Sequence, residues 1–441
     1  MDERAWPYLR TLLFAALLGV PVAFAAVLLQ TAIHDVTQLV WEEIPDGFSW
    51  SEPPWWYVVL VPGLAGVTVA GALRLPGHGG HTPLEGLGIG AVRPVELPSI
   101  LLAALATLGL GLVLGPEAPL IALGLGLSSV AVRLARVDGA EAQPLILAGA
   151  FAAIAVLFGS PLVAAFLVFE LVAAGGAIPA RALGRALLPG FVAAGTGALV
   201  FTGVGDWPGL EQVSLSLPDL PAYETIRIAD LAWCLLVATA VAVVVVGLRQ
   251  LAHRIGDRAT SRPVTTLVAA GLLVGSLAAV FRAIADRPVD LVLFSGQEAM
   301  PAVIAEASAG VLLLLVAAKG LAYALSLGAG FRGGPVFPAL LVGVAIGVLA
   351  ADALPGLGLT PAVATGIAAA TAAVLRVPFT AVLLATILVG SSAADVAPIA
   401  VLGAAVGWLV AVALPNPEDR EGPEPAGAGS SEKRTGRDSN P

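Results

Sequence analysis

The sequence predicts an all-α polytopic membrane protein, and its composition, its apolar runs and the breaks within those runs support that class. Of 441 residues, 58% are hydrophobic and 12% are charged, whereas soluble domains carry about 25% charged residues. Several apolar runs reach the roughly 20 residues that cross a bilayer as a helix. The apolar runs, some of them shorter than this, lie at 11–29, 57–73, 98–115, 143–157, 230–248, 263–281, 308–330 and 396–414.

Glycine and proline interrupt other apolar stretches, and such breaks are typical of discontinuous or re-entrant helices buried inside protein. The first apolar run follows "MDERAWPYLRTLLF", in which acids accompany the arginines. This is not the pattern of a cleaved signal peptide, so we expect the run to remain as the first membrane segment. Residues 415–441 are rich in Pro, Gly and Ser and lack periodicity, which predicts a disordered cytoplasmic tail.

Charge along the chain predicts how the segments are oriented in the cell membrane. Residues 33–57 and 204–228 form two long polar loops that carry acids and one basic residue of the Lys/Arg type, Arg227. Arginines gather instead in clusters outside these loops, at Arg4 and Arg10, at Arg133 and Arg136, at Arg181 and Arg185, and at Arg249, Arg254, Arg258 and Arg262. Because basic residues mark cytoplasmic loops, we expect a multi-pass protein with both termini in the cytoplasm and both acidic loops outside.

The chain also repeats internally. "GPEAPLIALGLGL" around Pro119 is echoed by "GPVFPALLVGVAIG" around Pro338, 219 residues later. "FGSPLVAAFLVFEL" around Pro161 is echoed by "LRVPFTAVLLATIL" around Pro378, 217 residues later. The orientation above gives the first half an odd number of crossings, so the second half is inverted. We therefore predict one transmembrane domain, 1–414, built from inverted repeats at about 8–203 and 229–414, an architecture common among transporters.

Each repeat contains a Gly-Pro-x-x-Pro sequence that opens an apolar helix. Proline suits the first helical turn, because its missing N–H leaves no donor unpaired there. The remaining free N–H groups and the positive end of the helix dipole then point at one place. Two such N-termini meeting inside the membrane would form an anion site made of backbone groups. A third candidate N-terminus lies in "GHGGHTPLEGLG" (77–88).

Glu117 is the single charged residue between Pro98 and Val132, and it falls in the first turn of one of these helices. A charged acid at the membrane centre costs about 2.5–3.5 kcal/mol on insertion scales, so we expect it to face a cavity. An ionised Glu117 would occupy the anion site and exclude the permeant ion, whereas a protonated one could leave. The sequence thus predicts a gate. The alternative is a structural acid that complements the helix dipole.

These motifs resemble those of the CLC family of chloride channels and chloride/proton antiporters. "GPEAP" (115–119) matches the family's G-[RK]-E-G-P motif and places Glu117 at its gating glutamate. "GGPVFP" (333–338) is similar to G-x-F-x-P, and "GGHTP" (79–83) loosely resembles G-S-G-I-P. The resemblance, which spans roughly residues 8–414, implies a CLC-like fold of discontinuous, tilted helices and a homodimer. It also implies an anion site at Gly80, His81, Thr82, Gly115, Pro116, Ala118, Gly334, Val336 and Phe337.

The sequence departs from the family pattern at several of these positions. Pro116 replaces the basic residue before the gating glutamate, and Ala118 replaces a glycine. The serine that contacts the ion aligns with Gly80, so Thr82 or the backbone would have to serve instead. Two further basic residues are candidates for a role near the anion path. Lys319 stands where the family usually has one, and Arg332 is either an attractor of anions or an interfacial side chain.

The resemblance leaves proton coupling open. The antiporters' internal proton-transfer glutamate aligns with Leu171, and Glu170 precedes it by one residue. Adjacent side chains on a helix point about 100° apart, so one cannot simply replace the other. Glu170 is thus a candidate proton relay, and its alternative is a buried acid bonded to its neighbours.

The leading hypothesis is transport of a small inorganic anion, chloride before others, by a channel-like or weakly proton-coupled protein. A proton-coupled halide antiporter or a fluoride exporter is the alternative within this class. A membrane-embedded enzyme is disfavoured, because the membrane segments contain no His/Asp/Glu constellation or Ser–His pair at catalytic spacing. With Cys234 as the one cysteine, we expect no disulfide and no metal or other cofactor. The expected partners are an anion, protons, the bilayer and a second copy, and no nucleic acid.

Overall fold

The computed structural model describes residues 5–90, 92–174, 180–204, 217, 220–223, 225–259 and 262–414. The expected disordered tail, 415–441, and most of the second acidic loop lie outside the described residues. In the described part, nine helices are long and apolar enough to cross a membrane. The predicted all-α polytopic membrane fold is therefore confirmed.

The helices of the first half begin with a long bent segment that comprises α1 (Ala5–Gln38), a π-turn at Leu39–Glu43 and α2 (Ile44–Gly47). The rest are α3 (Trp55–Ala72), α4 (Leu97–Gly109), α5 (Glu117–Leu134), α6 (Ala142–Phe158), α7 (Pro161–Ala174) and α8 (Ala180–Val204). The second half contains α9 (Ile228–Ala259), α10 (Pro263–Ala285), α11 (Met300–Ile304), α12 (Ala309–Gly328), α13 (Val336–Ala353), α14 (Leu359–Leu375), α15 (Pro378–Val389) and α16 (Ala393–Ala413).

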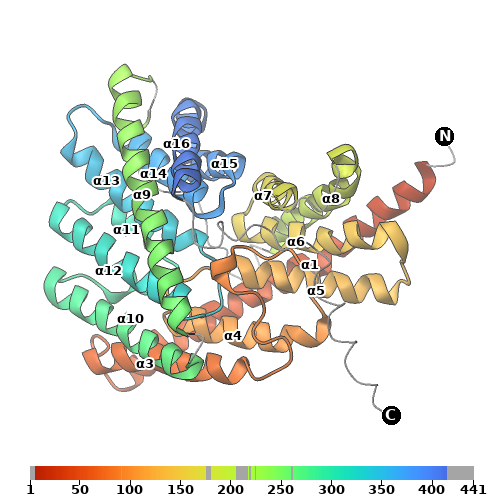
Figure 1. Ribbon diagram of the computed structural model, residues 1–441, viewed down its shortest axis with the longest axis horizontal. Helices are drawn as coiled ribbons and strands as arrows, with labels where there is room; N and C mark the ends of the chain where they lie inside the picture. The colour runs from red at the N-terminus through yellow and green to blue at the C-terminus, as the bar shows by residue number, and fades with distance from the viewer. Residues whose placement is uncertain are drawn as a thin grey trace, which may run out of the picture.

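Helices of the two halves match in length and in partners. Helices α5 and α13 have 18 residues each, and α6 and α14 have 17 each. Helix α6 packs on α5, α7 and α8, and α14 packs correspondingly on α13, α15 and α16. Figure 1 shows these two groups side by side, with α5, α6 and α8 in one and α13, α14 and α16 in the other. These observations support the repeat that the sequence predicts.

Glycines allow the closest helix contacts in both halves. A Cβ atom on Gly124 of α5 would overlap the backbone of Gly149 on α6, and the reverse is also true. Gly343 of α13 and Gly366 of α14 stand in the same relation. Small residues let helix backbones approach closely, which is how helices associate in a membrane that offers little hydrophobic driving force between them.

The two halves meet where the loops before α5 and α13 cross. Gly115 and Gly334 form an isolated antiparallel bridge. The N–H of Gly115 donates to the carbonyl of Gly334 at 2.7 Å, and the N–H of Gly334 donates back at 2.5 Å. The two residues are 219 positions apart, as the repeat landmarks are. Equivalent residues that exchange equivalent bonds are the mark of a local two-fold axis.

A second pair of contacts follows the same symmetry. The Thr107 hydroxyl on α4 accepts a hydrogen bond from the N–H of Arg332 at 3.2 Å. The Ser326 hydroxyl on α12 accepts one from the N–H of Val113 at 3.1 Å. Each hydroxyl also donates to the carbonyl four residues earlier in its own helix. These bonds pair buried N–H groups that no helix can satisfy, and they fix both loops that lead into α5 and α13. We call the four residues the hydroxyl clasp.

Candidate functional site

The Glu117 carboxylate lies where the N-termini of α5 and α13 meet. Glu117 is the first residue of α5, and its side chain is fully buried. Its Oε1 accepts a hydrogen bond from the backbone N–H of Phe337, in the first turn of α13, at 3.1 Å. The N–H of Val336 is also directed at the carboxylate. First-turn N–H groups have no partner within their helix, so an acid from one repeat satisfies the helix of the other.

Proline and glycine residues shape the site around the Glu117 carboxylate. Pro116 and Pro335 are the N-cap residues of α5 and α13. Gly115 and Gly334 leave space for the carboxylate, because a Cβ atom on either would overlap its oxygens. The motif glycines are therefore required by close approach.

The second carboxylate oxygen is unsatisfied. Oε2 of Glu117 is buried and has no hydrogen-bond partner among the described residues. A buried polar atom without a partner costs about 1–3 kcal/mol, and such exceptions to good packing concentrate at functional sites. The carboxylate is thus held on one side and free of bonds on the other, an arrangement suited to a group that leaves its place.

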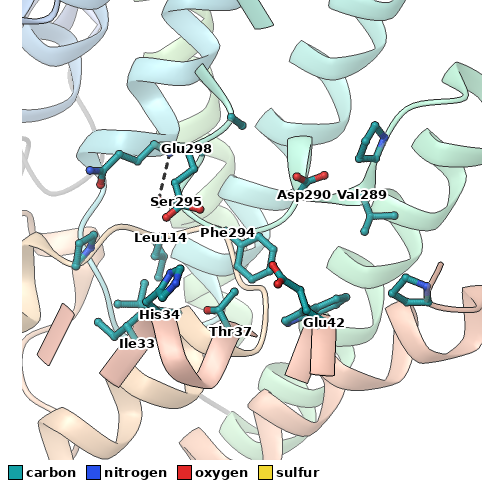
Figure 2. Close-up of a pocket in the computed structure, with 18 of the residues that line it drawn as sticks. Ile33, His34, Thr37, Glu42, Leu114, Val289, Asp290, Phe294, Ser295 and Glu298 are labelled. Atoms are coloured by element: carbon teal, nitrogen blue, oxygen red, sulfur yellow. Dashed lines mark hydrogen bonds between the residues drawn. The ribbon is translucent and has the colours of Figure 1, made fainter. Parts of the chain in front are cut away.

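A first cavity, of about 500 Å³, reaches Leu114 and Pro116, directly before Glu117. We call it the acidic cavity, because its wall carries four carboxylates, those of Glu42, Glu52, Asp290 and Glu298. Figure 2 shows Glu42, Asp290, His34 and Leu114 around it. Arg282 also lines this cavity, and its guanidinium lies 3.6 Å from the Glu52 carboxylate. Such a wall attracts protons and cations more than anions.

A second cavity, of about 420 Å³, reaches Ala118, Pro119 and Ala122, directly after Glu117. We call it the glycine-rich cavity, because residues 76–81 and the glycines at 88 and 90 form much of its wall. Arg332 and Gly333, from the loop before α13, complete it. Glu117 is therefore a buried residue with one cavity on the side of its preceding neighbour and another on the side of its following neighbour.

The third expected helix N-terminus takes another form. Gly80 and His81 line the glycine-rich cavity, whereas Thr82 is not part of its wall. The stretch 77–88 contains one turn of 3-10 helix, Pro83–Glu85, because the glycines on both sides of it adopt positive φ values. The Gly80 N–H donates to the Gly77 carbonyl at 2.8 Å, so this donor is already engaged.

Glu170 caps a helix of the other half. Its buried carboxylate accepts hydrogen bonds from the N–H groups of Phe379 at 2.9 Å and Thr380 at 2.8 Å, and from the Thr380 hydroxyl at 2.5 Å. These donors belong to the first turn of α15. The geometry fits the bonded, buried acid that the sequence left open, and a relay would first have to release three donors.

Two other buried polar side chains position the surroundings of the site. The Lys319 ammonium on α12 donates to the carbonyls of Leu293 at 2.6 Å and Phe294 at 3.0 Å, which holds the loop beside the acidic cavity. The Tyr323 hydroxyl, one turn later, donates to the Pro335 carbonyl at 3.0 Å. Sequence reasoning missed Tyr323 and the hydroxyl clasp, and the equal offset of 219 between Thr107 and Ser326 was the signal that could have found the clasp.

Two related helical halves, with broken helices that converge on one carboxylate between two cavities, define a polytopic membrane transport protein. The chain belongs to the voltage-gated chloride channel family, whose model matches residues 77–412. This membership makes it an anion-transport protein, not an enzyme, and confirms the family that its motifs resemble.

Curated relatives support this assignment. The chain is 30% identical over 368 residues to the ion-transport protein named YfeO of Escherichia coli O1:K1 / APEC, with 79% of this chain and 82% of that protein covered. It is also 30% identical over 361 residues to YfeO of Shigella boydii serotype 4 (strain Sb227), with the same coverage.

Solved structures share the fold at low sequence identity. A slow cyanobacterial Cl⁻/H⁺ antiporter matches with a TM-score of 0.77 and 20% identity, over 92% of this chain and 95% of that one. A CLC-type fluoride/proton antiporter matches with a TM-score of 0.70 and 19% identity, over 91% of this chain and 95% of that one.

Proposed function

We propose that this protein carries small inorganic anions, chloride before others, along a path through the two cavities, with Glu117 as its gate. One observation carries the proposal. Pro116, directly before the buried Glu117, lines the acidic cavity, and Ala118, directly after it, lines the glycine-rich cavity. The Glu117 carboxylate is bonded to the N-terminus of α13. The backbone dipoles at that point can replace part of an anion's hydration and still release the ion.

The gating mechanism follows from the charge of the carboxylate. An ionised Glu117 is attracted by the N-terminal dipoles and holds the N–H of Phe337. A proton removes that charge, and the neutral acid loses most of the attraction. An anion can then take the N–H groups of Val336 and Phe337, beside Gly115, Pro116, Ala118 and Gly334. Low pH on the side from which Glu117 is protonated therefore favours the open path.

Flux from proteoliposomes loaded with chloride tests the gate. Wild-type flux should rise as pH falls, because protonation releases the carboxylate. Glu117→Gln keeps the shape of the side chain but cannot ionise, so its flux should persist and lose its pH dependence. Asp352→Asn, which changes an exposed acid near the end of α13 that lines neither cavity, is the matched control and should retain the wild-type profile. An unchanged pH dependence in Glu117→Gln would refute the gating role.

Proton-coupled halide antiport is a second candidate, and two observations favour it. Four carboxylates line the cavity next to Pro116 and can supply protons to Glu117. The two solved structures named above are described as a Cl⁻/H⁺ and a fluoride/proton antiporter. Recording pH during the same flux experiment separates the cases. Proton movement in fixed ratio to chloride or fluoride means antiport, and anion flux without it means a channel-like protein.

We further propose a homodimer in the cell membrane with both termini in the cytoplasm and the acidic cavity outside. The arginine clusters and the acids Glu42 and Glu52, from the first acidic loop, support this orientation. Large apolar side chains are exposed on helices α7, α15 and α16, at Leu162, Phe166, Phe379, Trp408 and Leu409. The same proposal keeps one transmembrane domain, 1–414, with repeats at about 8–203 and 229–414. The mass of the detergent-solubilised particle tests the dimer.

A further inference from the structure

Arg332 presents a buried cation to the glycine-rich cavity. Its residue is 8% exposed and lines that cavity. The guanidinium donates to the His78 carbonyl at 3.0 Å and to the His81 carbonyl at 3.5 Å. Its Nε is buried and has no hydrogen-bond partner in the described part of the chain. The hydroxyl of Thr107 accepts a hydrogen bond from the Arg332 N–H, and this bond fixes the backbone from which the side chain extends.

Of the other charged groups around this cavity, Arg93 and Glu96 form an ion pair, whereas Glu85 acts on Arg332 from beyond ion-pair distance. Arg93 pairs with Glu96 at 2.6 Å, and His81 pairs with Glu85 at 3.3 Å. Among the described residues, no carboxylate is within ion-pair distance of Arg332. A guanidinium keeps its charge at all ordinary pH values, and a buried charge without a counter-charge is strongly unfavourable. The Arg332 guanidinium therefore has no carboxylate bonded to it, and Glu85 offsets its charge only at longer range.

Gly79 packs closely against the Arg332 guanidinium. A Cβ atom on Gly79 would come within 2.9 Å of the Arg332 Nε, and Gly79 has a φ of +74°. Glycine thus lets the loop pack against the guanidinium at a point where a side chain would collide with it and most other residues would also be strained.

We propose that Arg332 is an anion-binding residue of the glycine-rich cavity, which holds a small inorganic anion at its guanidinium, whose Nε–H has no partner in the described part of the chain, before or after that anion passes Glu117. This inference rests on the proposed function and adds a site of a different kind. The site at α13 binds an anion through backbone dipoles, whereas this site binds it through the full charge of a guanidinium that also donates to two carbonyls. Anions are then concentrated at the mouth of the path that the glycine-rich cavity forms.

Chloride binding to purified wild-type protein, measured by isothermal titration calorimetry at alkaline pH, tests the site while an ionised Glu117 occupies the α13 N-terminus. Arg332→Gln removes the charge and should weaken chloride binding by about tenfold or more, as expected for a lost charge-assisted hydrogen bond. Arg93→Gln is the matched control, because Arg93 lines the same cavity but is exposed and paired. It should bind chloride as the wild type does.

The chloride concentration that gives half-maximal flux supplies a second measurement. In Arg332→Gln it should rise together with the dissociation constant, while the maximal flux is retained or increased, because a bound anion leaves more easily. A merely structural arginine would instead lower the maximal flux and the thermal unfolding temperature. Arg332→Lys keeps the charge without the Nε–H and should bind chloride with intermediate affinity.

Wild-type affinity in Arg332→Gln, or equal weakening in Arg332→Gln and Arg93→Gln, would overturn the inference. Should Arg332→Gln fail to fold, wild-type affinity in Arg332→Lys would overturn the role of the Nε–H. The proposed transport can be refuted independently of this site. Chloride binding that depends on Arg332 in a protein without anion flux would support this site and refute the transport.

Discussion

Glu117 and Val336 occupy equivalent positions, as the first residues of α5 and α13. The symmetry of the two halves ends at these side chains. Two carboxylates at the same place would repel each other, and one of them would be driven to its neutral form. A single acid, attached to one helix and bonded to the other, makes use of both N-termini without that conflict. The aliphatic Val336 leaves its N–H available for the shared carboxylate or for an anion.

The tight fit around Glu117 gives a prediction for Gly334. In Gly334→Ala the added methyl group overlaps Oε2, so the carboxylate must move away from the N-terminus of α13. We expect chloride flux at neutral pH to increase and its pH dependence to weaken. Overpacking should also lower the free energy of unfolding by about 1–3 kcal/mol.

Two variants check this explanation. Gly247→Ala on α9 adds a methyl group where no atom lies within 4 Å, so it should leave flux unchanged. In the double variant Glu117→Ala/Gly334→Ala, the glycine substitution should add little, because interacting residues show non-additive effects. Equal effects of Gly334→Ala with and without Glu117 would contradict the overlap as the cause.

At the scale of elements, the helices of one half are completed by groups from the other. Glu170 of α7 caps α15, as Glu117 of α5 occupies the N-terminus of α13. The two acids differ in what they leave unpaired. Both oxygens of Glu170 are bonded, whereas one oxygen of Glu117 is not. One interaction is therefore suited to hold two helices together, and the other to be broken.

Replacing the cap tests this distinction. Glu170→Gln removes the charge and brings an amide donor against N–H donors, so the free energy of unfolding should fall by about 1.5–3 kcal/mol. Any proton-to-anion ratio should stay at the wild-type value, as measured by flux with pH recording. Glu85→Gln, which alters an exposed acid on the loop beside the glycine-rich cavity, should leave stability nearly unchanged. Loss of proton movement at unchanged stability would instead identify Glu170 as a relay.

At the scale of the whole molecule, the two halves are joined by bonds that repeat each other. The bridge between Gly115 and Gly334 and the hydroxyl clasp connect the same two loops. They hold both helix N-termini at one depth, which a site made from two helices requires. In the proposed mechanism, rigid placement of this kind lets a small movement of one carboxylate open or close the anion path.

The clasp should therefore affect stability and gating together. Ser326→Ala leaves the Val113 N–H unpaired, and Thr107→Val does the same to the Arg332 N–H. Each should lower the free energy of unfolding by about 1–3 kcal/mol and shift the pH at half-maximal flux. Denaturant titration in detergent measures the first effect. Thr239→Val, an exposed threonine of α9, is the control, and an equal loss there would argue against the clasp.

Several features of the site could be predicted from the sequence because they depend on local chemistry. The prolines and glycines at 115–119 and 333–338 predicted two helix starts, and the structure begins α5 and α13 within those motifs. The third start, at 77–88, was less accurate, because four positive-φ glycines break the stretch into turns. The cap of Glu170 and the bonds of Arg332 join residues more than 200 positions apart, and no local pattern encodes such contacts.

By itself, the sequence determined the membrane class, the repeat offset and the one acid in a long apolar segment, because hydropathy and helix-start chemistry act over a few residues. The tertiary structure alone decided where that acid is bonded, which oxygen it leaves free and which cavities it separates. It also decided that the Thr107 and Ser326 hydroxyls accept hydrogen bonds from the N–H groups of Arg332 and Val113, and that the Arg332 Nε stays unpaired. These depend on how two distant loops meet, and packing of the whole chain fixes that meeting.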